Sequence, residues 1–125
     1  MENHGSIRNG LLLAAFFSVS ALAHSQAEPR AATPAPGSIV PAPTEISIVF
    51  SEPLSAQTSN IYVTTNSDTP VTRASAFLDP NNQAHMVLPL PRLQPGRYSV
   101  HWVALGVDGR RSENQYKFTV PYPVR

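Results

Sequence analysis

The chain of 125 residues contains no cysteine. No disulfide can restrict its unfolded state, so its stability must come from a packed core. The lack of thiolates also excludes a structural zinc site of four cysteines and a cysteine-ligated iron–sulfur cluster. Any metal site in this chain must therefore use imidazole, carboxylate, thioether or backbone nitrogen.

The chain also lacks a large net charge of either sign. The formal net charge is +1, which provides no electrostatic footprint for nucleic acid or for an anionic membrane surface. We therefore expect no nucleic-acid partner.

Long apolar runs are scarce too, and the one candidate lies near the start of the chain. The run LLLAAFFSVSALA, residues 11–23, follows Arg8 and ends in the small-x-small form that signal peptidase accepts. Its apolar core is too short to span a bilayer comfortably as a permanent helix. We predict a cleaved signal peptide over residues 1–23, one domain over residues 24–125 and no membrane insertion after cleavage. An uncleaved N-terminal anchor is the alternative.

Proline, by contrast, is abundant and divides the rest of the chain into short segments. The 13 prolines disfavour helix interiors and favour extended or turn backbone. Between them, apolar and polar residues alternate with the period of half-buried strands. The clearest such segments are EISIVF (45–50), RYSVHWVA (97–104) and QYKFTV (115–120), and the less regular ones are SNIYVTT (59–65), VTRASAF (71–77) and AHMVLPL (84–90).

About seven short strands over roughly a hundred residues, separated by turns rich in Pro, Gly, Asn and Asp, predict an all-β antiparallel sandwich. Large side chains on one face of each strand are expected to form the core, because their burial removes much apolar area from water. This set comprises Ile46, Ile48, Phe50, Tyr98, Val100, Trp102, Tyr116, Phe118 and Val120.

Few side chains after residue 23 can bind a metal. His101 lies between two core residues of a strand, so it should point out of the sandwich. His85 and Met86 are adjacent and should face opposite sides. His24 differs from these residues, because cleavage after Ala23 would give it a free α-amine beside its imidazole, and the two nitrogens form a chelate.

The mature sequence resembles the CopC family of periplasmic copper-binding proteins over nearly its whole length. The resemblance rests on an N-terminal AH, then PGSIVPAPTEISIVFSEPL, and then LPLPRLQPGRYSVHWVALGVDGRRSENQYKFTV. The elements F-S-E, P-G-x-Y-x-V-x-W and D-G, in this order behind a signal peptide, form a fairly specific signature. The family's fold, an immunoglobulin- or cupredoxin-like Greek-key β-sandwich, agrees with the strand pattern.

The resemblance implies a periplasmic, non-enzymatic protein of copper resistance or homeostasis that sequesters or delivers Cu(II). The implied ligands are His24, through amine and imidazole, with Glu52 and Asp108. Cu(II) favours nitrogen ligands in a tetragonal arrangement, which carboxylate oxygens can complete. A membrane copper transporter is the exchange partner that the family resemblance suggests.

The chain also departs from the family pattern. Arg110 replaces the second histidine of the family's D-x-H, and arginine carries only donors, so it cannot ligate a cation. It would repel Cu(II) and could pair with Asp108 or Glu52 instead. Gly106 stands where the family usually has serine, and Asn114 where it usually has glycine. The Met/His-rich Cu(I) loop of two-site members is missing, so we expect a weakened copper site.

Three other functions compete with this one. A β-sandwich that has lost copper could serve as an interaction or structural module, its former site closed by a salt bridge of Arg110. A copper oxygenase would need a second histidine opposite His24, which His85 or His101 would have to supply. The sequence contains no Ser/His/Asp spacing or Gly-rich loop in the context of a known catalytic motif, so it predicts no hydrolase.

Overall fold

A computed structural model describes residues 26–71 and 74–123 as a sandwich of two antiparallel sheets. The predictions of a signal peptide over residues 1–23 and of a ligand at His24 lie outside the described residues. The strands are β1 (Pro29–Thr33), β2 (Glu45–Phe50), β3 (Asn60–Thr65), β4 (Phe77–Asp79), β5 (Asn82–Pro89), β6 (Gly96–Leu105) and β7 (Arg111–Val120).

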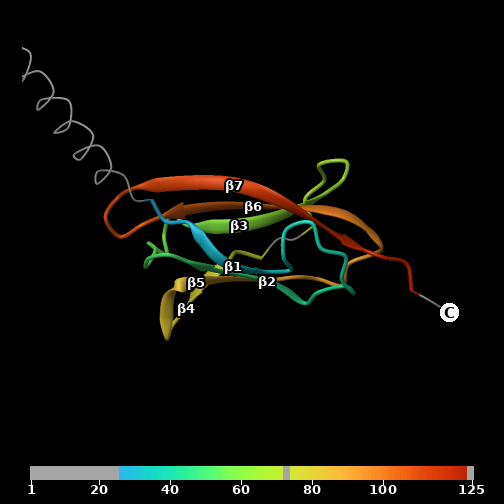
Figure 1. The fold of residues 1–125 in the computed structure, drawn as a ribbon, viewed down its shortest axis with the longest axis horizontal. Helices are drawn as coiled ribbons and strands as arrows, with labels where there is room; N and C mark the ends of the chain where they lie inside the picture. Colours follow the sequence, from blue (N-terminus) through green and yellow to red (C-terminus); the bar gives the residue numbers. More distant parts are fainter. Residues whose placement is uncertain (1–25, 72–73, 124–125) are drawn as a thin grey trace, which may run out of the picture.

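The strands form one layer in the order β1-β2-β5-β4 and a second in the order β3-β6-β7. Figure 1 shows the two layers edge-on, with β7, β6 and β3 above β1, β2, β5 and β4. The chain changes layer after β2, β3 and β5, whereas β4–β5 and β6–β7 are hairpins within one layer. This all-β architecture confirms the predicted fold class.

The core lies between the layers and contains the predicted side chains. Phe50 of one layer meets Trp102 of the other edge-on at 5.2 Å between ring centroids. Tyr98 and Phe118 stack at 5.5 Å. Burial of the two aromatic pairs and the branched aliphatic residues supplies the stability that no disulfide provides. Of the predicted core, Tyr116 is partly buried and the rest is buried.

The strand pattern predicted β2 to the residue, but it was wrong about VTRASAF (71–77). Within that segment, Phe77 begins β4 and residues 74–76 form a loop. The backbone N–H of Ala76 donates to the side chain of Asn60 at 3.2 Å rather than to a neighbouring strand.

Strand β1 was not predicted, because it lies in the proline-rich segment. Pro29 begins the strand, and β1 pairs with β2 alone at the sheet edge, where proline is tolerated.

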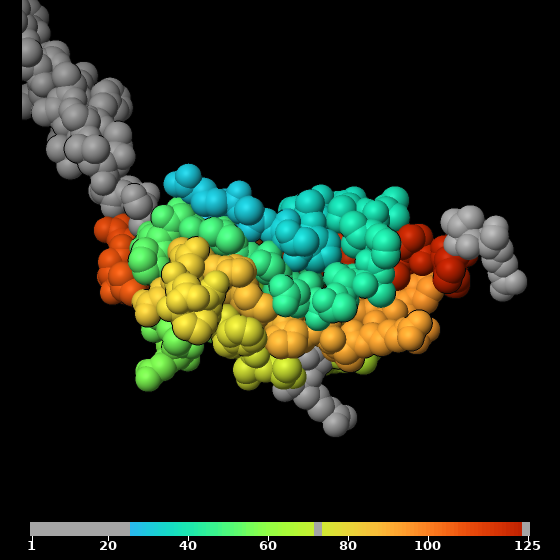
Figure 2. All heavy atoms as spheres, turned by 90° about the horizontal axis from the view of Figure 1, so that it is seen from below, coloured from blue at the N-terminus to red at the C-terminus, as the bar shows by residue number. Residues whose placement is uncertain are grey.

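Figure 2 views the molecule from the side of the β1-β2-β5-β4 layer. The yellow β4–β5 hairpin lies beside the green and teal chain around β2 on this face. Among residues 26–71 and 74–123, no helix is long and apolar enough to cross a membrane.

Candidate metal site

The end of the sandwich where β2 and β6 finish brings together two segments that are far apart in sequence. Leu54 and Gly106 form an antiparallel bridge. The N–H of Ser55 donates to the carbonyl of Leu105 at 2.7 Å, and the N–H of Val107 donates to that of Pro53 at 3.3 Å. These hydrogen bonds hold the residues after β2 against the β6–β7 turn.

The turn itself is compact, and Asp108 stabilises it. The N–H of Gly106 donates to the carbonyl of Arg110 at 2.9 Å, which closes the hairpin. Gly109 has φ +90°, a left-handed conformation that glycine adopts without strain. Asp108 Oδ1 accepts the N–H of Arg110 at 3.0 Å. Asp108 thus acts as an Asx-turn residue of the kind common in tight turns.

The carboxylates of Glu52 and Asp108 converge above Gly106. A Cβ placed on Gly106 would lie 2.5 Å from Glu52 Oε1 and 2.9 Å from Asp108 Oδ1. The two oxygens therefore flank one point that only a glycine leaves open. The structure brings together the two acidic residues predicted from the sequence, and the glycine that departs from the family pattern permits their approach.

The first described residues lie at this same end. Ser112 Oγ donates to the carbonyl of Ala27 at 2.7 Å, and the backbones of Glu28 and Ser51 are linked at 2.8 Å. Ala27 itself is buried in the core. Figure 1 shows this blue start of the described chain beside the orange β6–β7 turn. Ala27 and Glu28 are thus fixed beside Ser51, the residue before Glu52.

Arg110 contacts Asp108 with its side chain as well as its backbone. Its Nε lies 3.7 Å from Asp108 Oδ2, and both side chains are about half-exposed. The guanidinium therefore pairs with Asp108, one of the two partners expected for it. In the described part of the chain, no group of three or more histidine, aspartate or glutamate side chains is close enough to hold a metal.

The family model of the CopC domain matches residues 30–121. The chain belongs to the CopC family. Protein YobA of Escherichia coli K12 is 30% identical over 83 residues, which is 66% of this chain and 67% of YobA.

Solved structures share the CopC fold. CopC from Methylosinus trichosporium OB3b aligns with a TM-score of 0.74 and 23% identity, covering 80% of this chain and all of that one. PcoC, a methionine-rich copper resistance protein from Escherichia coli, aligns with a TM-score of 0.69 and 30% identity. The second alignment covers 77% of this chain and 99% of PcoC.

The two described histidines of this CopC domain lie away from the Glu52–Asp108 pair. His101 points outward, as predicted, and stacks on Tyr62 at 4.5 Å between ring centroids. Its Nε2 is hydrogen-bonded to Thr64 Oγ1 at 3.0 Å, and desolvation lowers the pKa of the ring. His85 and the buried Met86 face opposite sides of their strand, also as predicted. The ring of His85 contacts Ser47 and Asp79 instead of the acidic pair.

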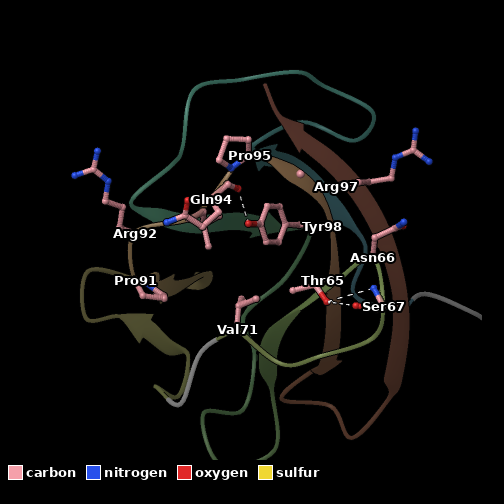
Figure 3. Close-up of a pocket in the computed structure, with 12 residues that line it drawn as sticks. Thr65, Asn66, Ser67, Val71, Pro91, Arg92, Gln94, Pro95, Arg97 and Tyr98 are labelled. Atoms are coloured by element: carbon pink, nitrogen blue, oxygen red, sulfur yellow. Dashed lines mark hydrogen bonds between the residues drawn. The ribbon is translucent and has the colours of Figure 1, made fainter. Parts of the chain in front are cut away.

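The opposite end of the CopC domain has an open hollow of about 510 Å³, drawn in Figure 3. Tyr98 points into it and donates its hydroxyl to the carbonyl of Gln94 at 2.6 Å. The side chains of Arg92 and Arg97 point away from the hollow. The Tyr98 hydrogen bond fixes the loop before β6.

Sequence reasoning did not predict the roles of Ser112 and Ser51. Both are small polar residues that hold the N-terminal segment through hydrogen bonds to its backbone. A serine that caps a distant carbonyl leaves no pattern in the sequence, because its partner is 85 positions away.

Proposed function

We propose that the mature protein begins at His24 and binds Cu(II) through the α-amine and imidazole of that residue, with Glu52 and Asp108. Its role is sequestration or delivery of the ion in the periplasm, without catalysis. The observation that carries this proposal is the convergence of the two carboxylates beside Gly106. PcoC, a copper resistance protein with the same fold, supports the choice of metal.

The length of the N-terminal segment is compatible with this ligand set. His24 precedes the anchored Ala27 by three positions, and three residues of extended chain span about 10 Å. The amine and imidazole of a terminal histidine supply two nitrogens, which Cu(II) prefers, and the carboxylates supply oxygens. Binding would displace protons from the amine and the imidazolium, so affinity should fall on acidification.

Arg110 is the reason to propose a weak site. A guanidinium beside Asp108 stabilises the empty state of that carboxylate and adds positive charge where the cation would bind. Copper must therefore displace this ion pair. The same ion pair favours a second candidate function, an interaction or structural module that no longer binds copper.

Calorimetric titration with Cu(II) tests the proposal on three proteins. One begins at His24, one begins at His24 with its α-amine acetylated, and one carries His24→Ala at its terminus. We expect the first to bind at least about tenfold more tightly than the other two, because the first alone has the amine–imidazole chelate of histidine. Equal affinities in all three would leave the copper-free module as the better account.

A membrane copper transporter is the proposed recipient of the ion. Transfer requires the site to be accessible, and both Asp108 and Arg110 are about half-exposed. Mixing the copper-loaded protein with such a transporter in vesicles would reveal uptake of the metal if delivery is the role.

A further inference from the structure

Ser47, His85 and Asp79 form a hydrogen-bonded chain on the outer face of the β1-β2-β5-β4 layer. Ser47 Oγ lies 2.6 Å from His85 Nε2, and His85 Nδ1 lies 3.2 Å from Asp79 Oδ2. Each residue comes from a different strand, namely β2, β5 and β4. The order hydroxyl, imidazole, carboxylate is that of a serine nucleophile with its base and its orienting acid.

The carboxylate determines which ring nitrogen carries the proton. The pKa of Asp79 is lowered, first by the backbone N–H of Asn81 and then by the hydrogen bond from His85. An ionised carboxylate only accepts hydrogen bonds, so His85 Nδ1 must donate to it. In the neutral ring, Nε2 then has a free lone pair and Ser47 must donate its hydroxyl proton to it. The contacts therefore select the tautomer in which His85 can act as a base toward Ser47.

Ser47 is partly exposed, with Thr33 of β1 on one side and apolar side chains on the other. Ser47 is paired with Val87 across the sheet, and Val87 is paired with Phe77. The Phe77 side chain is half-exposed, and the His85 side chain is 24% exposed. A small apolar group attached to Ser47 would contact Val87 and Phe77 without entering the core.

We propose that Ser47 is a covalent acyl-acceptor site, with His85 as its general base and Asp79 as the positioning residue, for small apolar acyl groups carried on activated esters. This site is separate from the proposed copper site and does not depend on it. The reaction resembles the acylation step of a serine hydrolase.

The reaction balances without a further reagent. Ser47 Oγ forms a bond to the acyl carbon and its proton passes to His85 Nε2, while the ester bond to the leaving group breaks. The leaving alkoxide or phenolate takes the electron pair, and the imidazolium returns its proton to the leaving group or to water. Ser47, Ile48 and Val49 of β2 are paired with both β1 and β5, so the sheet engages their amides and they are not available to stabilise an oxyanion. We therefore expect one acylation per chain rather than rapid turnover.

The second described histidine offers a matched internal control. His101 Nε2 contacts Thr64 Oγ1 at 3.0 Å, so it has the hydroxyl–imidazole half of the arrangement. In the part of the chain that the structure describes, no carboxylate is hydrogen-bonded to its Nδ1. Thr64 should accordingly stay unmodified under conditions that acylate Ser47.

The test is incubation of the mature protein with p-nitrophenyl acetate, followed by tandem mass spectrometry that locates each acetyl group. We expect one acetyl ester on Ser47, none there in Ser47→Ala, and none on Thr64. His85→Gln should slow acetylation of Ser47 by about 100-fold, since a positioned base typically contributes that much. Asp79→Asn should slow it at least about tenfold, and His101→Gln should leave the rate unchanged.

Thermal unfolding of each variant shows that it is folded, which separates lost reactivity from lost structure. An unmodified Ser47 in the folded wild-type protein would overturn the proposal. So would acetylation of Ser47 in His85→Gln at the wild-type rate. Acetyl groups confined to the α-amine and Lys117, the chain's one lysine, would count against it equally.

Discussion

Arg110 contacts the carboxylate of Asp108 with both its backbone and its side chain. The backbone N–H of Arg110 donates to Oδ1 at 3.0 Å, and its Nε lies 3.7 Å from Oδ2. The backbone contact shapes the turn and does not depend on the side chain of residue 110. A substitution there can therefore remove the guanidinium and keep the turn.

Arg110→His should raise the affinity for Cu(II) by about tenfold or more, as measured by calorimetric titration of the protein that begins at His24. The change removes a cation that competes for Asp108 and introduces a nitrogen ligand. Arg111→His is the matched control, because Arg111 pairs with Glu113 at 2.9 Å rather than with Asp108. Equal gains from both substitutions would show that net charge, and not this contact, governs binding.

The sequence predicted part of this arrangement. Because arginine is a permanent donor, its pairing with a nearby acid could be expected once the family resemblance had placed Asp108 at the site. The approach of Glu52 and Asp108 at Gly106 could not be predicted from the sequence, since it depends on hydrogen bonds between residues 50 or more positions apart. The ligand role of His24 stays a prediction.

At the scale of elements, a side-chain hydrogen bond links the N-terminal segment to β7. Ser112 Oγ donates to the carbonyl of Ala27 at 2.7 Å, and Ser112 lies at the start of β7. Through this contact, the strand that leaves the β6–β7 turn also positions the chain that follows His24. The contact is partly buried, so its loss would leave the carbonyl with a weaker partner.

Ser112→Ala should lower the free energy of unfolding by about 1 kcal/mol and also lower the affinity for Cu(II). The second effect follows because His24 must be held near Glu52 and Asp108 to share an ion with them. Chemical denaturation and calorimetric titration measure the two quantities. Ser38→Ala is the control, since Ser38 donates to Ala35 at 2.7 Å in a loop outside the site. An unchanged copper affinity in Ser112→Ala would mean that this anchor does not position the ligand.

Alternation of apolar and polar residues predicted the strands that face the core, because burial dictates that pattern. It could not predict β1, because the residues of β1 are mostly exposed and the strand forms only by pairing with β2. It also extended a strand over residues 74–76, where a side-chain acceptor on Asn60 takes the backbone N–H of Ala76. Edge and loop segments are therefore where sequence patterns fail in this fold.

At the scale of the whole molecule, stability depends on packing between two layers that no disulfide joins. Tyr116 contributes an unfavourable feature to this packing. Its hydroxyl is buried and has no hydrogen-bond partner among the described residues. Burial raises the pKa of Tyr116 to about 12. Folding thus favours the neutral phenol over the phenolate.

Tyr116 should make the protein less stable in alkali. A phenol with a raised pKa contributes stability that is present below its unfolded pKa of about 10 and is lost as the pH rises toward 12. Tyr116→Phe should remove this loss and, by deleting an unpartnered hydroxyl, leave stability at neutral pH equal or higher by about 1 kcal/mol. Denaturation curves between neutral and alkaline pH would measure both effects. A steep alkaline loss that persists in Tyr116→Phe would assign it to another group.

The last strand runs from the β6–β7 turn to the far end of the sandwich, where Val120 pairs with Gly96. The chain therefore leaves the fold at the end opposite the β6–β7 turn, as Figure 1 shows. A tether or reporter protein fused after the last residue would be attached at the end remote from the β6–β7 turn and its acidic pair. Immobilised in that way, each molecule would present the proposed copper site to a docking partner, while a fusion at the other terminus would mask it.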